Sequence, residues 1–190
     1  MIEVTRETKE TQITVKLNLY GTGKAKIDTG VGFYDHMLEA FTKHSHMDME
    51  VTCKGDTHID DHHTVEDVGI VIGQALRQAI YPVQSIERFG NATVVMDEAS
   101  VSCDIDLSNR GYLVFELPIG GKVGNFDVEL VEEFFKAFAF NLPLTLHLIY
   151  NRGKNKHHII EAAFKALAVS LRRAVAKNEN AGIPSTKGVL

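Results

Sequence analysis

The chain has 190 residues, of which 44% are hydrophobic and 24% are charged, and its formal net charge is −5. This length allows one domain or two small fused halves, and the composition excludes disordered, collagen-like and low-complexity proteins. The acidic balance and the lack of a basic stripe disfavour nucleic-acid binding, and no run reaches the ~18 apolar residues of a membrane span. The chain opens in a strand pattern and not in a signal peptide, so we expect a cytoplasmic protein.

Strand-like and helix-like patterns follow one another along the chain. In the strands, polar and apolar residues alternate, whereas in the helices the apolar residues recur every three or four positions. In the first half we expect strands over 10–19 and 27–32, a helix over 33–42, a strand over 47–53 and a helix over 64–80 that Pro82 ends. In the second half we expect strands over 93–96, 101–107 and 112–117, a helix over 130–140, a strand over 144–150 and a helix over 158–177.

The two halves are similar to each other residue by residue. When residues 62–80 are set on 157–175, both histidines and a Glu, a Leu, an Arg and an Ala coincide. Residues 10–19 lie over 98–107 with the apolar positions in step. We therefore predict a single α+β domain, residues 1–190, made of two pseudo-repeats at about 1–85 and 86–190. Two unrelated helices that share common residues remain the alternative.

The two cysteines, Cys53 and Cys103, lie inside predicted strands. The chain has neither a Cys-x-x-Cys motif nor a secretory signal. We therefore expect two reduced core residues and no disulfide.

The element His-His-x-x-Glu occurs twice, at 62–66 and at 157–161. On a helix the first His and the Glu share a face, whereas the second His points ~100° away. Each copy therefore has one ring more than its own site can use. If the halves, or two subunits, pack around a twofold axis, the surplus rings complete each other's sites. The predicted sites are His62, Glu66 and His158 in one, and His157, Glu161 and His63 in the other.

Mixed imidazole and carboxylate ligands suit Mn²⁺, Fe²⁺ or Zn²⁺, and the lack of paired thiolates disfavours a structural zinc site. The order of residues differs from the His-Glu-x-x-His of zinc proteases, which disfavours a protease. His36 and Glu133, at the starts of two further helices, are candidates for one more ligand each. Acceptors for the other ring nitrogens are available in Asp60, Asp61 and Asp67. Ordinary surface or core histidines remain the alternative.

Three basic residues in loops punctuated by Gly or Pro suggest an anion site: Arg88, Arg110 and Lys187. Loop side chains are free for function, and backbone N–H groups in such loops can face a phosphate. Solvated surface residues are the alternative. Together with a metal pair, these cations suggest a small phosphorylated substrate.

Several motifs carry a resemblance to a known family. They are Thr29-Gly-Val-Gly-Phe-Tyr-Asp-His-Met-Leu38, Asp61-His-His-Thr-Val-Glu-Asp67, Arg88-Phe-Gly90, Ser108-Asn-Arg-Gly111, Gly153-Lys-Asn-Lys-His-His-Ile-Ile-Glu-Ala162 and Pro184-Ser-Thr-Lys-Gly-Val189. Nearly end to end, the chain resembles the imidazoleglycerol-phosphate dehydratase family of histidine biosynthesis. The resemblance implies duplicated half-domains of the ribosomal protein S5 domain 2-like type, with β-sheets backed by helices. It also implies a homo-oligomer of 24 subunits built from trimers, with active sites between subunits.

The resemblance implies two Mn²⁺ ions in each active site. One would take His36, His63, His157 and Glu161, and the other would take His62, Glu66, His158 and the residue at position 133. Many members have His at that position, where this chain has Glu133. The phosphate would lie against Arg88, Arg110, Ser185, Thr186 and Lys187, with Lys165 close to the metal-bearing helix. Glu10 would contact the substrate and act as the acid/base carboxylate, and His62 and His157 would join it in catalysis.

The implied reaction is the dehydration of D-erythro-imidazole glycerol phosphate to imidazole acetol phosphate. In that reaction a metal-bound imidazolate expels the neighbouring hydroxyl through a diazafulvene-like intermediate, and a carboxylate then removes the acidified proton. Two alternatives use the same residues. One is a two-metal phosphohydrolase, and the other is a metal-binding assembly without chemistry.

Overall fold

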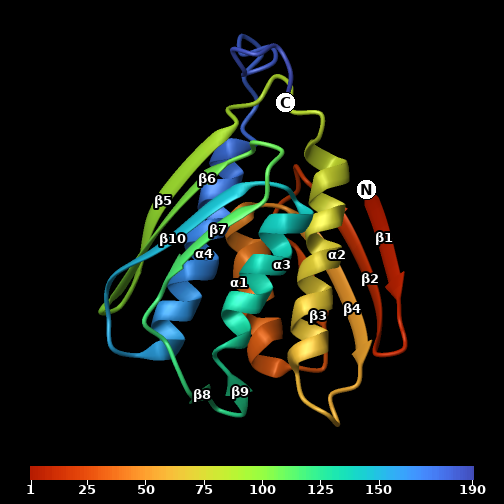
Figure 1. Cartoon of the computed structure of the whole chain (residues 1–190), viewed down its shortest axis with the longest axis vertical. Helices are drawn as coiled ribbons and strands as arrows, with labels where there is room; N and C mark the ends of the chain where they lie inside the picture. Colours follow the sequence, from red (N-terminus) through yellow and green to blue (C-terminus); the bar gives the residue numbers. More distant parts are fainter.

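The computed structural model describes residues 1–190, with two four-stranded sheets on opposite sides of a layer of four helices (Figure 1). The first half of the chain contributes β1 (Ile2–Glu7), β2 (Thr11–Asn18), β3 (Ala25–Asp28), α1 (Gly32–Ser45), β4 (Asp48–Gly55) and α2 (His62–Ile80). The second half contributes β5 (Phe89–Met96), β6 (Ala99–Asp106), β7 (Tyr112–Glu116), β8 (Lys122–Val123), β9 (Phe126–Asp127), α3 (Leu130–Asn141), β10 (Thr145–Arg152) and α4 (Lys156–Ala174). The predicted α+β class, with sheets backed by helices, is confirmed.

The two sheets have the same topology. Their strand orders are β1-β2-β4-β3 and β5-β6-β10-β7, and in each sheet the only parallel pair is the last one, β4 with β3 or β10 with β7. Alternate residues of β2 face the helices and are buried, among them Ile13, Val15 and Leu17. This alternation is the period-two signal of a half-buried strand. The short β8–β9 hairpin has no counterpart in the first half.

The helices pack in two equivalent pairs, α1 against α4 and α2 against α3. Two glycines let the second pair approach closely. A Cβ atom at Gly73 of α2 would lie 2.8 Å from Cβ of Asn141 and 3.0 Å from the carbonyl oxygen of Phe138. At Gly69, a Cβ atom would lie 3.1 Å from the carbonyl oxygen of Phe134. The backbone of α3 therefore occupies the space where larger residues of α2 would project.

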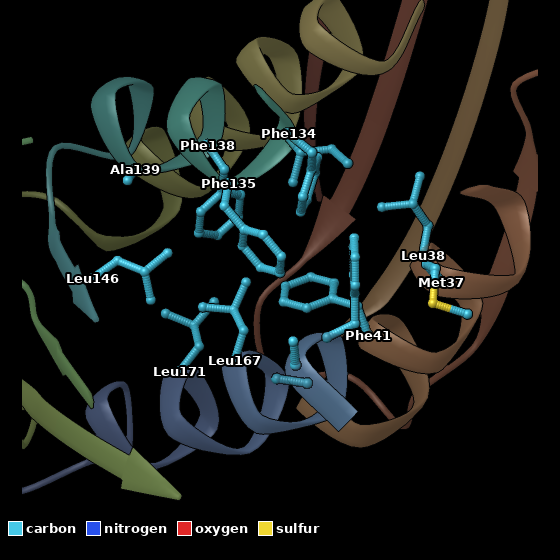
Figure 2. Packing of buried hydrophobic residues seen from close by; sticks show 14 of the residues in the cluster. Met37, Leu38, Phe41, Phe134, Phe135, Phe138, Ala139, Leu146, Leu167 and Leu171 are labelled. Carbon is cyan, nitrogen blue, oxygen red and sulfur yellow. The ribbon is translucent and has the colours of Figure 1, made fainter. Parts of the chain in front are cut away.

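A single hydrophobic cluster of 49 buried residues runs through both halves. Its centre is aromatic: Phe134 of α3 stacks on Phe164 of α4 with ring centroids 5.0 Å apart. Phe138 meets Phe41 of α1 edge-on with ring centroids 6.1 Å apart, and Figure 2 shows both of these side chains. Because the first and second halves share this core, each half buries its apolar face only in the presence of the other. Cys53 and Cys103 are both free thiols. None of the helices combines the length and apolar character needed to cross a membrane.

Candidate metal and substrate sites

The second His-His-x-x-Glu copy lies at the start of α4. The side chain of Asn155 caps this helix by accepting hydrogen bonds from the backbone N–H groups of His157 and His158, at 2.9 and 3.5 Å. Since a capped helix has regular geometry from its first turn, His157 and Glu161 share one face. Their Nε2 and Oε2 atoms are 3.1 Å apart.

His36 of α1 joins this pair because α1 packs against α4. Its Nε2 lies 3.4 Å from Oε2 of Glu161. The ligand atoms of His36, His157 and Glu161 all lie within 4.8 Å of one another. We call this group the α4 cluster. It contains three of the four ligands that the resemblance implies for one ion, and it comes entirely from one chain.

The two carboxylate oxygens of Glu161 face different groups, one the ammonium of Lys165 and the other the imidazoles of His36 and His157. Its side chain is only 7% exposed, and Oε1 lies 2.6 Å from the Nζ atom of Lys165, whereas Oε2 faces the imidazoles. Burial raises the pKa of the Glu161 carboxyl, but the hydrogen bond and charge of Lys165 and the charge of His36 outweigh it, so the pKa lies below its ordinary value. The carboxylate is therefore negative and has one oxygen available for a divalent cation.

The first His-His-x-x-Glu copy lies at the start of α2. Nε2 of His62 is 3.7 Å from Oε2 of Glu66, and both side chains are more than two-fifths exposed. Asp60 accepts a hydrogen bond from the backbone N–H of His62 at 2.8 Å. The chain brings no third ligand to this pair. Glu133 lies in the first turn of α3, where its nearest charged partner is Lys136 at 3.9 Å.

The second rings, His63 and His158, lie apart from both groups and face carboxylates of their own. Nδ1 of His63 lies 3.0 and 3.2 Å from the two oxygens of Asp56, and its Nε2 is 3.7 Å from Glu10. Nδ1 of His158 lies 2.7 Å from Oε2 of Glu98. Each of these hydrogen bonds raises the pKa of its imidazole. Within one chain, therefore, His63 and His158 do not reach the metal-ligand groups that they were predicted to complete.

Glu98 is held by more than His158. The hydrogen bond from His158 is the largest influence on its pKa, followed by those from the backbone N–H groups of Asn155 and Lys154, and together they lower the pKa to about 2. Glu98 is thus a fixed anion at neutral pH, at the place where α4 begins.

The loop residues predicted to bind phosphate line one cavity of about 360 Å³: Arg88, Arg110, Ser185, Thr186 and Lys187. Arg88 is fixed there, because its guanidinium donates to both oxygens of Asp106, at 2.7 and 3.1 Å, and to the carbonyl of Pro184 at 2.7 Å. We call this cavity the cationic cavity. Its three positive side chains and the hydroxyls of Ser185 and Thr186 suit a phosphate group.

The cationic cavity and the α4 cluster lie at opposite ends of the molecule. The backbone N–H of Arg88 bonds to the carbonyl of Ala174, in the last turn of α4, whereas His157 lies in the first turn. At 1.5 Å of rise per residue, these two positions are separated by about 26 Å along the helix axis. Figure 1 likewise shows the segment after α4 at the end of the molecule opposite to the β8–β9 hairpin.

A family model for imidazoleglycerol-phosphate dehydratase matches residues 29–171 of this chain. The chain belongs to the imidazoleglycerol-phosphate dehydratase family. Over 190 residues, covering the whole of both chains, it is 93% identical to the imidazoleglycerol-phosphate dehydratase of Sulfurovum sp. (strain NBC37-1) and 66% identical to that of Sulfurimonas denitrificans.

Solved structures of imidazoleglycerol-phosphate dehydratases have the same fold. The enzyme from Pyrococcus furiosus in complex with (S)-C348 is 41% identical and superposes with a TM-score of 0.87 over 98% of this chain and 100% of its own. The enzyme from Staphylococcus aureus subsp. aureus N315 is 40% identical, with a TM-score of 0.83 over 93% and 99% of the two chains. The resemblance seen in the sequence motifs is therefore confirmed.

Asp60, Asp61 and Asp67, which the sequence offers as acceptors for the ring nitrogens, hydrogen-bond to no imidazole within this chain. Asp67 is buried, and it accepts hydrogen bonds from Arg6 and Thr11. The ring partners are Asp56 and Glu98, which the sequence analysis did not identify. A signal for Glu98 was present, because the repeat alignment sets it on Glu10.

The residues of the α4 cluster fit the divalent metal that the imidazoleglycerol-phosphate dehydratase family implies. Two imidazole nitrogens and one carboxylate oxygen converge there, and no thiol is near. This donor set is typical of Mn²⁺, Fe²⁺ and Zn²⁺ sites that keep positions open for a substrate.

Proposed function

We propose that this chain dehydrates D-erythro-imidazole glycerol phosphate to imidazole acetol phosphate in L-histidine biosynthesis, with two Mn²⁺ ions in each active site. Membership of the imidazoleglycerol-phosphate dehydratase family makes the chain a hydro-lyase. The observation that carries the two-metal proposal is the α4 cluster, whose three ligand atoms lie within 4.8 Å of one another.

The α4 cluster would hold one ion, with His63 as its fourth ligand. His62 and Glu66 would hold the other, with His158 and Glu133. Bound divalent ions would supply the positive charge that favours the deprotonated form of the substrate's imidazole ring. Lys165 keeps the carboxylate of Glu161 charged, since its ammonium lies 2.6 Å from Oε1 and offsets the cost of burial.

The cationic cavity would bind the phosphate of the substrate. Arg88 is held in place by Asp106 and Pro184, while Arg110 and Lys187 add positive charge from neighbouring loops. Fixing the phosphate at one end of the substrate orients the carbon chain toward the metal ions. This converts a flexible ester into a positioned reactant.

Glu10 would be the acid/base residue. It lies in the turn between β1 and β2, where Thr8 accepts a hydrogen bond from its backbone N–H at 3.1 Å. Its side chain is 52% exposed and makes no hydrogen bond, with Nε2 of His63 3.7 Å away. This free carboxylate takes the proton from the carbon next to the one that loses its hydroxyl as water, and the resulting enol becomes the ketone.

An active site of this kind needs more than one copy of the chain. About 26 Å of α4 separates the cationic cavity from the α4 cluster, which is far longer than an imidazole ring joined to a three-carbon phosphate ester. We therefore propose that one copy supplies the phosphate site and another copy the ligands of the α4 cluster. A homo-oligomer of 24 subunits built from trimers would provide these contacts, and we propose that it works in the cytoplasm without nucleic-acid or membrane partners.

The identity of the product tests this proposal. Purified enzyme incubated with Mn²⁺ and imidazole glycerol phosphate is expected to give the ketone with loss of one water, measured by mass spectrometry. Release of inorganic phosphate would indicate a phosphohydrolase instead. Binding of metal and substrate without any product would indicate a metal-binding assembly.

A further inference from the structure

His63 and His158 are the two rings of these elements that contact no carboxylate on their own helix. His62 and His157 each face such a carboxylate through Nε2, Glu66 in one case and Glu161 in the other. His63 and His158 instead meet a carboxylate through Nδ1, from Asp56 and Glu98. Their anchors thus come from loops outside the helices.

Asp56 follows β4 directly, and its side chain is 13% exposed. Both of its oxygens are within 3.2 Å of Nδ1 of His63. A carboxylate in this position accepts a hydrogen bond from the Nδ1–H group, so the neutral ring keeps its proton on Nδ1 and its lone pair on Nε2. The ring is also prevented from turning about its own bond to Cβ.

Glu98 is anchored at both oxygens. Oε1 accepts hydrogen bonds from the backbone N–H groups of Lys154 and Asn155, at 3.1 and 2.8 Å, and Oε2 accepts from His158 at 2.7 Å. The carboxylate of Glu98 therefore links the backbone of the turn before α4 to the imidazole of His158. The position of His158 is fixed relative to the start of the helix.

The two halves reach this arrangement by different routes. The repeat alignment sets Glu98 on Glu10, but Glu10 has no contact with Nδ1 of His63. Asp56 is equivalent in the repeat to Asn151, since each lies six residues before the first His of its copy. Asn151 donates a hydrogen bond to Ser102 at 2.8 Å and does not contact an imidazole. Each half therefore supplies one ring-holding carboxylate, from non-equivalent positions. Because both halves place a carboxylate against Nδ1 of the second histidine from different positions, we infer that this hydrogen bond has a function.

We propose that Asp56 and Glu98 are positioning residues that fix the tautomer and orientation of His63 and His158, so that each ring presents Nε2 to a divalent metal ion. This inference rests on the proposed two-metal function. The carboxylates do not touch the metal themselves. They act through the rings, as acceptors behind metal-binding imidazoles do in other proteins.

The test compares loss of the acceptor with loss of the charge, using full-length protein and Mn²⁺ titration followed by electron paramagnetic resonance. Asp56→Ala and Glu98→Ala remove the acceptor, and each is expected to weaken Mn²⁺ binding by about 10- to 100-fold. Asp56→Asn and Glu98→Gln keep an acceptor oxygen but lose the charge, so a loss of only several-fold is expected.

Asp60→Asn is the matched control, because it removes a nearby charge and keeps a side-chain oxygen for the backbone N–H of His62, and Asp60 hydrogen-bonds to no ring. It should change Mn²⁺ affinity by no more than about twofold, since exposed charges are screened by salt. Circular dichroism and the melting temperature of the metal-free proteins check that the variants fold. If Glu98→Ala does not fold, Asp56→Ala and Glu98→Gln carry the test.

Unchanged Mn²⁺ affinity in folded Asp56→Ala, or an equal loss in Asp56→Ala and Asp60→Asn, would overturn the positioning role. Failure of the wild-type protein to bind Mn²⁺ or to form the ketone would instead overturn the proposed function. The two failures are therefore separate observations.

Discussion

At the level of single residues, Glu10 and Glu98 hold equivalent places in the repeat but have different environments. Glu98 is bound on both oxygens by His158 and the backbone, whereas the carboxylate of Glu10 makes no hydrogen bond. A group that must exchange a proton with a substrate needs this freedom, and a group that positions a ring needs the opposite.

The role of Glu10 predicts a defect in turnover and not in binding. Glu10→Gln keeps the size of the side chain and removes its ability to accept the substrate proton. We expect kcat to fall by at least about 10²-fold, within the range of lost acid/base catalysis, with little change in the Kd of the substrate. Steady-state kinetics and calorimetry measure the two quantities, and Glu7→Gln on β1 is the control. Near-normal turnover would remove Glu10 from the mechanism.

The two thiols are expected to react slowly with alkylating reagents. Burial raises the pKa of Cys53 from 9.0 to about 11 and that of Cys103 to about 12. Because the thiolate is the reactive form, Cys53 at pH 8 should react about 100-fold more slowly than a thiol of ordinary pKa. Its rate should still rise with pH between 8 and 10. Iodoacetamide labelling followed by mass spectrometry measures this, with urea-unfolded protein as the control, and rapid labelling of the folded protein at pH 8 would contradict it.

Among the elements, the helix starts show what the sequence could and could not predict. The apolar pattern predicted helices from 64 and 158, whereas α2 begins at His62 and α4 at Lys156. The residues by which these helices start earlier than predicted are polar and show no apolar periodicity. At α4 the side chain of Asn155 caps the helix, and at α2 Asp60 accepts a hydrogen bond from the backbone N–H of His62. The β8–β9 hairpin was missed because strands of two residues are too short for an alternating pattern.

Within the metal site, spacing along one helix was the part that the sequence could predict. The pairs His62–Glu66 and His157–Glu161 follow from the geometry of a helix turn. His36 joins the α4 cluster only because α1 packs on α4, and Asp56 reaches His63 only because β4 ends beside α2. Such contacts depend on tertiary packing, so the sequence could offer His36 only as a candidate ligand at a helix start, which the family resemblance then assigned, and Asp56 was not identified.

The close contact of α2 with α3 predicts that a helix-favouring substitution will destabilise the protein. Gly73→Ala improves helix propensity, but its Cβ atom would lie 2.8 Å from Cβ of Asn141, so α3 must shift. We expect a loss of about 1–3 kcal/mol in the free energy of unfolding, as for other overpacked cores. Urea unfolding of metal-free protein measures it. The exposed Gln78→Ala on the same helix is the control and should be nearly neutral. A stabilised Gly73→Ala variant would show that the helices have room to move.

For the whole molecule, the α4 cluster is short of one implied ligand, and the pair at α2 is short of two. If other copies of the chain supply them, metal ions hold copies together as well as serving the reaction. Removing metal with a chelator is then expected to abolish turnover and to shift the protein to smaller species, as measured by analytical ultracentrifugation. Restoring Mn²⁺ should reverse both changes. A fully active enzyme that is free of metal would contradict this expectation.

The separation of the cationic cavity from the α4 cluster has a consequence for genetics. An allele that damages the phosphate end, such as Arg88→Ala, leaves the metal end of the same polypeptide intact, and His157→Ala does the reverse. When both alleles are expressed in one cell, mixed assemblies should contain some sites with two intact parts, so the pair should restore growth without histidine where each allele alone fails. Two alleles that damage the same end, such as His157→Ala with Glu161→Ala, should not complement. Failure of the first pair, with both proteins folded and co-assembled, would mean that one polypeptide provides both ends of its own site.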